Sequence, residues 1–444
     1  MFETLKNAFK SKDIRMKMFF TLALILVYRI GCYIPLPTLT PNAINEWFTS
    51  GGDFFGVLSV ITGGAMSNAT LFSLGILPFI NSFIIMQLLT LVIKPLERLS
   101  KEGEEGRKKI TQITRIVAII LAIIQAIGIV VTLNSNGAIN PLFGYEKNSE
   151  TAPILTMAIT IVMLVGGSTM VMWLSERITE YGIGNGTSII IFIGILATAG
   201  TSVAKAIRFM TEQTANWVYV WNLLGYILVV VAILFFIVFI DSSERRIAVQ
   251  YSKQIKGNKM YGGQTTYIPI RVNGSGVMPI IFASSLLMFP QMIIQLFFST
   301  TPAAAWYAQY MGSNTPVYYV LLALLILGFS YFYAQIQFNP EDVSKNIQQY
   351  GGFIPGIRAG KPTSDFLRKI NNRITLFGAV FLMIIALVPT FIFQALSGQY
   401  SGYDLGLANS FSATGLLIVV SVALELNKQL ESQIMMKHYK GFLK

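Results

Sequence analysis

The chain has 444 residues, of which 53% are apolar and only 12% are charged, and its formal net charge is +12. A soluble domain usually carries about a quarter charged residues, so this composition excludes an ordinary soluble enzyme and favours a protein embedded in a bilayer. The single cysteine, Cys32, and the single histidine, His438, exclude an intrachain disulfide, a Cys/His zinc site and Ser-His-Asp or Cys-His catalysis.

Long apolar runs predict an all-α integral membrane protein with ten transmembrane helices. Each run approaches the roughly 20 residues that cross the hydrocarbon, and none alternates strictly with polar residues as barrel strands do. The first run lacks a small-residue cleavage site, so we expect it to be a span rather than a removable signal. The ten predicted spans are Met18–Ile34, Leu71–Ile93, Thr114–Leu133, Pro153–Leu174, Ile183–Thr201, Val218–Ile240, Val277–Phe297, Val317–Phe338, Ile374–Phe393 and Leu405–Glu425.

The segment between the first two spans is unusual. Residues Gly51–Asn68 (GGDFFGVLSVITGGAMSN) are glycine-rich and moderately apolar, and they contain no Lys or Arg. This segment is too short and too interrupted to cross a bilayer. Irregular backbone at membrane depth is tolerated where protein or a water-filled cavity surrounds it. We therefore expect a short re-entrant or pore-inserted helix here.

A short motif occurs twice. Gly75-Ile-Leu-Pro78-Phe-Ile80 opens the second span, and Gly276-Val-Met-Pro279-Ile-Ile281 opens the seventh. If these positions are equivalent, the chain consists of two five-helix halves, 1–213 and 214–444. Because each half has an odd number of spans, the halves are inverted relative to each other. Interrupted helices at matching places in inverted halves indicate a pathway at their interface.

Lysine and arginine are distributed asymmetrically about the predicted spans. With both termini in the cytoplasm, almost all of these residues lie on the inner side, as the positive-inside rule requires. Only Lys147, Lys205 and Arg208 fall outside, and Arg29 falls within the first span. The net charge therefore indicates membrane orientation rather than nucleic-acid binding.

Two cytoplasmic connections, 241–274 and 339–373, are too long to be simple links. They can be docking sites for a cytoplasmic partner, or solvated basic loops that obey the positive-inside rule. No Walker-type phosphate loop is present, since Pro362 follows the lysine of the nearest stretch, Gly356–Pro362.

Four stretches carry a resemblance to a known family: GGAMSNATLFSLGILPFINSFIIMQLLT (63–90), ERITEYGIGNGTSIIIFIGI (176–195), NGSGVMPIIFASSLLMFP (273–290) and NPEDVSKNIQQYGGFIPGIRAGKPT (339–363). With them the chain resembles the SecY/Sec61-alpha family of protein-conducting channels along nearly its whole length. The resemblance implies a central hourglass pore between two pseudo-symmetric halves, a short plug helix and a side gate toward lipid. It implies a cell-membrane protein without enzyme activity or a cofactor. The implied partners are SecE, SecG, the SecA ATPase, the ribosome, secretory precursor polypeptides with signal sequences, and membrane lipids.

The resemblance also implies a pore ring and a plug. An apolar ring can close around a polypeptide without fixed hydrogen bonds and can gate by dewetting. The family often has another apolar residue one turn before Ile191, where this chain has Thr187. The implied ring residues are Ile76, Ile80, Ile191, Ile281 and Ile418. The implied plug comprises Phe55, Gly56, Val57, Leu58, Ser59, Val60, Ile61, Thr62, Gly63, Gly64, Ala65, Met66 and Ser67.

Polar residues on the second, third and seventh spans are candidates for a lateral gate, and plain helix packing is the alternative. A hydrogen bond of such a side chain to a neighbouring helix contributes roughly 1 kcal/mol to helix association in lipid. The candidates are Asn81, Gln87, Gln125, Ser284 and Ser285. Arg358, on a glycine-rich tip, is the candidate for docking of the motor, because a guanidinium makes forked contacts with carboxylates or phosphates. A second basic patch, suited to ribosomal RNA or an acidic motor surface, comprises Arg245, Arg246, Lys253, Lys256 and Lys259.

Three other classes compete with a channel. A secondary transporter would need ionisable groups in mid-membrane, and Asp and Glu are nearly absent from the spans. A membrane-embedded enzyme would need Ser-His, paired Asp or metal ligands there. An accessory homologue with few substrates stays open, although the intact GGFIPGIRAG tip (351–360) favours a general channel.

Overall fold

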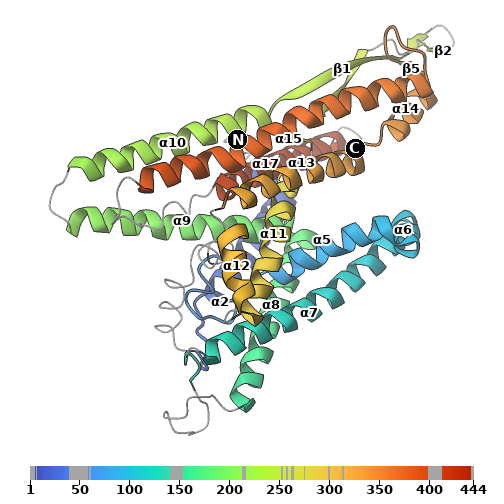
Figure 1. Ribbon diagram of the computed structural model, residues 1–444. Helices are drawn as coiled ribbons and strands as arrows, with labels where there is room; N and C mark the ends of the chain where they lie inside the picture. The colour runs from blue at the N-terminus through green and yellow to red at the C-terminus, as the bar shows by residue number, and fades with distance from the viewer. Residues whose placement is uncertain are drawn as a thin grey trace. The chain divides into compact units, whose positions relative to one another are not determined.

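The computed structural model describes residues 6, 8–39, 59, 62–135, 137–140, 154–212, 217–251, 254–256, 259–261, 265–274, 276–298, 301–312, 315–398 and 413–441. The described chain is mostly helical (Figure 1). Its contacts divide it into two units. Unit 1 comprises Met1–Val220, Ser285–Thr315 and Gln399–Lys444, and unit 2 comprises Trp221–Ser284 and Pro316–Gly398.

Unit 1 is a helical assembly. Helix α5 packs on α7, α7 on α8 and α8 on α9, while α2 contacts α8 and α9, and α17 contacts α9. Its helices are α2 (Lys12–Gly31), α5 (Leu77–Val92), α6 (Lys94–Lys101), α7 (Glu104–Ser135), α8 (Ile154–Tyr181), α9 (Gly186–Glu212), α12 (Pro302–Met311), α17 (Ala413–Gly441) and the part of α11 (Met278–Phe297) from Ser285 onward.

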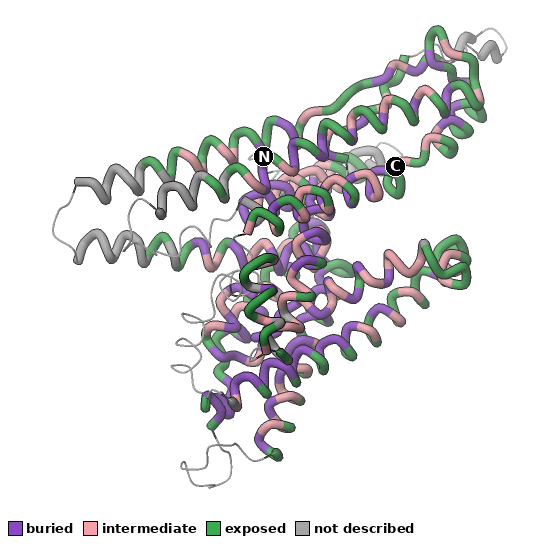
Figure 2. Tube along the Cα trace, in the orientation of Figure 1, coloured by how far each residue is buried: buried purple, intermediate pink, exposed green. Residues whose placement is uncertain are grey.

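Burial in unit 1 concentrates where helices cross. Leu133, Ala126 and Val130 of α7 and Leu164 of α8 belong to one apolar cluster of buried residues. Figure 2 shows buried residues along α5, α7 and α8, whereas α6 is exposed. Helix α6 differs because its sequence, KPLERLSK, is amphipathic and charged, so it has no apolar surface wide enough to bury.

Unit 2 contains α10 (Trp217–Asp241) from Trp221 onward, α13 (Pro316–Gln337), α14 (Pro340–Gln349), α15 (Lys361–Gly398) and the start of α11. Helix α15 packs on α13 and α14. Helix α14 begins at Pro340, a residue suited to a first helical turn because its missing N–H would have no partner there. The Asn339 side chain accepts a hydrogen bond from Glu341 N at 3.1 Å and caps this end.

The two long connections that the sequence predicts as loops are folded together. Strand β1 (Glu244–Tyr251) pairs antiparallel with β4 (Thr265–Arg271) and with the short β5 (Gly352–Phe353), and β2 (Gln254–Lys256) pairs with β3 (Lys259–Tyr261). Ile247 faces Ile268, and Gln250 faces Phe353. We call this sheet with α14 and the start of α15 the cytoplasmic tip, after the side of the membrane on which the sequence predicts it to lie (Figure 1).

Apolar residues bury one face of the sheet in the cytoplasmic tip. Ile247 and Val249 of β1 and Ile270 of β4 form a cluster with Ile347 of α14 and Leu367 of α15. The alternation in β1, where Ile247 and Val249 are buried and Ala248 only partly so, is the period of two expected for a strand with one covered face.

Each of the ten predicted spans overlaps a helix: α2, α5, α7, α8, α9, α10, α11, α13, α15 and α17. Residues 405–412, the beginning of the last predicted span, lie outside the described residues. Within the described residues, four helices are long and apolar enough to cross a membrane, and a fifth qualifies if α5 and α6, whose axes differ by 99°, count as one broken span. The second span begins later than predicted, at Leu77 rather than Leu71, because residues 71–76 form turns. Gly75 in this stretch has φ +56°, a left-handed conformation that prevents α5 from extending toward Leu71.

Candidate functional site

The segment predicted as the plug is described only in part. Phe55, Gly56, Val57, Leu58, Val60 and Ile61 lie outside the described residues. Residues 62–67 form turns rather than a helix, with φ of +67° at Gly63 and +81° at Gly64. Both values lie in the left-handed region that favours glycine. The side chains of Thr62, Ala65 and Met66 are buried, so this end of the segment is packed within unit 1.

The five isoleucines predicted for the pore ring are all buried, with exposed fractions from 2% at Ile76 to 9% at Ile281. Ile76 precedes the first turn of α5, and Ile80 lies one turn later. Ile191 belongs to α9 and Ile418 to α17, two helices that pack together. Ile281 belongs to the part of α11 in unit 2. Their convergence into a ring stays a prediction.

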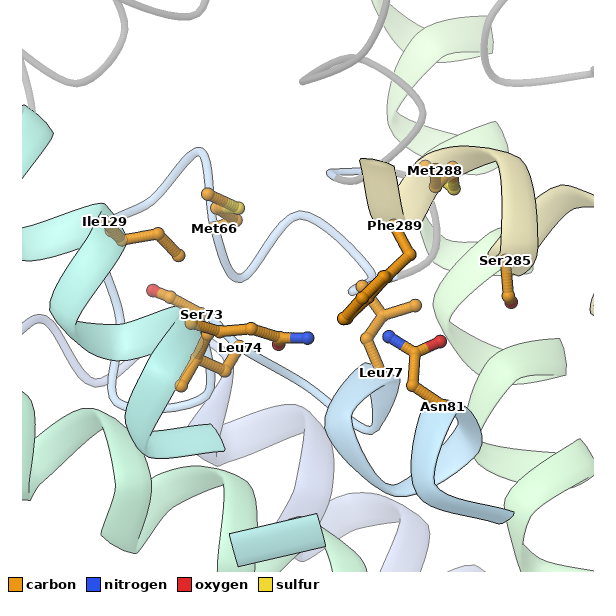
Figure 3. Close-up of a pocket in the computed structure, with 10 residues that line it drawn as sticks. Met66, Ser73, Leu74, Leu77, Asn81, Ile129, Ser285, Met288 and Phe289 are labelled. Carbon is orange, nitrogen blue, oxygen red and sulfur yellow. The ribbon is translucent and has the colours of Figure 1, made fainter. Parts of the chain in front are cut away.

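Three of the five residues predicted for the lateral gate line one cavity of unit 1. Asn81 of α5, Gln125 of α7 and Ser285 of α11 surround about 30 Å³, which is room for about two water molecules. The remaining lining residues are Met66, Ser73, Leu74, Leu77, Ile129, Met288 and Phe289. We call this space the gate cavity. Figure 3 shows Leu77, Asn81 and Phe289 directed toward one another at one end of it.

Gln125 is the most unusual member of the gate cavity. Its side chain is 3% exposed, and within the described part of the chain its Nε2 has no hydrogen-bond partner. A buried donor without a partner is costly, so the arrangement is held less firmly than a fully bonded one. The neighbouring polar side chains are those of Asn81, Ser285 and Ser73. They can form hydrogen bonds with water, or with the polar groups of another helix that enters this space.

Two predicted gate residues do not line the gate cavity. The Ser284 hydroxyl donates to Ile281 O of its own helix at 3.0 Å, and Gln87 lies two turns beyond Asn81 along α5. Phe289 and Met288 also line it, although no sequence pattern singled them out. Helical spacing could have found Phe289, because it lies four residues after Ser285 and thus on the same face of α11.

The predicted docking residues lie in the cytoplasmic tip or near it in the sequence. Arg358 is exposed on the turn between β5 and α15, where Gly356 and Gly360 have φ of +82° and +94°. The Thr363 hydroxyl donates to Arg358 O at 2.8 Å and fixes this turn to the start of α15. The guanidinium is therefore presented from a fixed backbone, as forked recognition of an anion requires.

The second basic patch is spread over β1 and the β2–β3 hairpin. Arg245 and Arg246 of β1 are exposed, and Arg246 Nε donates to Glu244 Oε1 at 2.8 Å. Lys256 and Lys259 are register partners in the hairpin, and Lys253 lies outside the described residues. Exposed pairs such as Arg246–Glu244 contribute little to stability, so this pair would cost little to break if Arg246 bound a partner.

Comparison with known proteins identifies the family. The SecY family model matches residues 70–427. "Protein translocase subunit SecY" of Streptomyces scabiei is 41% identical over 448 residues, covering 100% of both chains. The protein of the same name from Halalkalibacterium halodurans is 39% identical over 447 residues, again covering 100% of both.

Solved structures share the fold at lower identity. One described as "The structure of a protein conducting channel" superposes with a TM-score of 0.65 at 20% identity, covering 94% of this chain and 91% of the other. Sec61 in a canine ribosome–channel complex gives a TM-score of 0.61 at 19% identity, with the same coverage. Because the family model spans more than half of the chain and the relatives span all of it, the chain belongs to the SecY family.

Proposed function

We propose that the chain is the channel subunit of a protein translocase in the cell membrane. It passes unfolded secretory polypeptides across the bilayer and releases transmembrane segments sideways into lipid. The observation that carries the proposal is the full-length similarity to translocase subunits, 41% in the case quoted above. The gate cavity adds support, because it places weakly bonded polar groups between apolar helices.

The architecture that accompanies this function has ten spans in two inverted halves, 1–213 and 214–444, with both termini in the cytoplasm. The ten helices at the predicted spans support the span count, and the distribution of lysine and arginine supports the orientation. The segment 55–67 is the plug, and the five buried isoleucines form the constriction around the passing chain.

Energy comes from partners, since the subunit itself is not an enzyme. The cytoplasmic tip binds the SecA motor or the ribosome, with Arg358 at the centre of the contact. The related canine channel was solved in a complex with a ribosome, which supports a ribosomal partner here. SecE and SecG are the small membrane subunits of the proposed complex.

A disulfide-trapping experiment tests the pore. A single cysteine replaces Ile281 in a Cys32→Ser background, and a secretory precursor with one mid-chain cysteine is stalled in membranes by a folded tail. We expect an oxidant to form a mixed disulfide that depends on the motor and ATP. Leu286→Cys, on the same helix and 41% exposed, is the matched control that should not react with the precursor.

Two results would contradict the proposal. One is the absence of an adduct at position 281 while a cysteine at the exposed Tyr350 of the cytoplasmic tip still reacts with a soluble thiol reagent. The other is equal reaction at positions 281 and 286, which would mean that the precursor passes along no defined constriction. Either result would reopen the secondary-transporter hypothesis.

A further inference from the structure

The last turn of α2 grips the turn at residues 62–64. Arg29 Nη1 donates a hydrogen bond to Gly63 O at 3.0 Å. Arg29 Nη2 donates to the Tyr33 hydroxyl at 3.4 Å, and the guanidinium carbon lies 5.5 Å from the centre of the Tyr33 ring. The guanidinium thus contacts Tyr33, two residues beyond the end of α2, while it also bonds the turn at residues 62–64.

Tyr28, the neighbour of Arg29, makes the adjacent contact. Its side chain is 1% exposed, and its hydroxyl donates to Thr62 O at 3.3 Å. Its ring stacks on Phe72, with centroids 6.0 Å apart and planes 9° from parallel. Two successive carbonyls, of Thr62 and Gly63, are therefore bonded by two successive side chains of α2.

Helix α9 also approaches this turn closely. A Cβ added at Gly63 would lie 2.9 Å from Gly194 Cα of α9 and 2.8 Å from Arg29 Nη1. Gly63, at φ +67°, thus has no room for a side chain beside the guanidinium and α9. The turn continues with Gly64 N donating to Ser59 O at 2.8 Å and Asn68 N donating to Gly64 O at 3.2 Å.

The charge of Arg29 needs an explanation. Within the described residues no carboxylate pairs with it, and its hydrogen-bond partners there are a backbone carbonyl and a phenol. A cation inside a predicted span is costly, and backbone carbonyls are a usual way of satisfying it. If packing were the only role of this position, an apolar side chain would be sufficient. The cation therefore indicates a contact with a function.

We propose that Arg29 is a positioning residue for the resting channel. It clamps the turn at 62–64, the carboxyl-terminal end of the segment proposed as the plug, against α9. The Tyr28–Thr62 bond is the second half of this clamp, and the absence of a side chain at Gly63 permits the close approach. Displacement of the turn requires both bonds to break. This inference rests on the proposed function only for its consequence in transport, and not for the clamp itself.

Hydrogen–deuterium exchange of the full chain in lipid nanodiscs tests the clamp without any transport. The observed amides are those of Gly64, Asn68 and Thr70, which all donate hydrogen bonds to carbonyls of residues 59–65. In Arg29→Gln they should exchange about tenfold faster, which corresponds to about 1.4 kcal/mol, because hydrogen bonds to charged groups lie at the strong end of the range. Gly63→Ala, which pushes the turn away from Gly194, should have the same effect.

The controls separate a clamp from general destabilisation. Arg115→Gln makes the same charge change but removes only the pair with Glu176, 2.7 Å away between α7 and α8, and should leave these amides unchanged. Arg29→Lys keeps the cation with a single-point donor and should give an intermediate rate. If Arg29→Gln fails to accumulate in membranes, Arg29→Lys and Gly63→Ala carry the test.

Equal exchange rates in the unmodified chain, Arg29→Gln and Gly63→Ala would overturn the clamp, as would acceleration by Arg115→Gln of the same size. The consequence for transport is measured separately. Arg29→Gln should raise resting ion leak and admit precursors with defective signals. If exchange accelerates but leak and precursor selection do not change, the clamp does not position a plug and the inference fails. If the Ile281→Cys adduct is absent in the unmodified chain, it is instead the proposed function that fails.

Discussion

The buried carboxamide of Gln125 gives a sharp test of the lateral gate. Replacing it with leucine removes the Nε2 donor, which has no partner within the described residues, and leaves a branched apolar side chain that is one atom shorter. Asn81, Ser285 and Phe289, which line the same cavity, are unchanged. We therefore expect Gln125→Leu to stabilise the closed gate.

The magnitude follows from the cost of a buried unsatisfied donor, which is about 1–3 kcal/mol. Water in the 30 Å³ cavity would satisfy part of this deficit, so the lower figure, about 1 kcal/mol, is the safer expectation. One leucine at the centre of a transmembrane segment favours insertion of that segment into the membrane by about 0.3–0.6 kcal/mol. If the closed gate is stabilised by about 1 kcal/mol, a model segment should need about two more leucines for half of it to be released through the gate into lipid.

A graded series of model segments measures this shift. Each segment has leucines in an alanine background, and the fraction released into lipid gives the leucine number at half-insertion. Gln87→Leu is the matched control, because Gln87 does not line the gate cavity and has an interaction elsewhere. The reasoning is refuted if Gln125→Leu lowers the leucine requirement or leaves it unchanged, or if Gln87→Leu raises it equally.

Two further predictions concern packing and charge. Gly167→Ala should destabilise unit 1 by about 1–3 kcal/mol or more, because the new Cβ would lie 1.9 Å from Leu71 O, a backbone atom. Gly166→Ala, with nothing within 4 Å, should be neutral, and thermal denaturation in detergent compares the two. Lys101→Met should raise the pKa of Glu97, which the hydrogen bond and the charge of Lys101 hold below its ordinary value. Because that pKa is lowered, the 2.6 Å pair supports α6 above it and is lost as pH falls through it. An NMR titration of the Glu97 carboxyl checks the direction, and an unchanged pKa would count against the pair.

Much of the membrane architecture could be predicted from the sequence, because it follows from local properties. A run of apolar residues forms a helix wherever it lies in a bilayer, since its backbone groups must be bonded internally. That is why every predicted span overlaps a helix. The turn before α5 was harder to predict. Its start at Leu77 depends on the backbone at Gly75, where a Cβ would meet the Thr62 side chain at 3.0 Å.

The cytoplasmic tip shows what sequence patterns left undetermined. Its two halves are separated by a long stretch of chain that includes α11 and α13. The alternation of Ile247 and Val249 could have indicated a strand, but the pairing of Gln250 with Phe353 depends on contacts between distant segments. The two connections, predicted as docking sites or solvated basic loops, therefore form a folded support for Arg358.

The sequence by itself determined the membrane class and the approximate helix positions, and it predicts that the basic residues face the cytoplasm, because composition, run length and charge are properties of single segments. Only the tertiary structure decided which polar groups meet. Asn81, Gln125 and Ser285 share a cavity, whereas Ser284, one residue away, bonds its own helix. The same holds for Arg29, whose partner Gly63 lies 34 residues further along the chain. Side chains on different helices come together according to how those helices pack, and a pattern of single residues does not specify that packing.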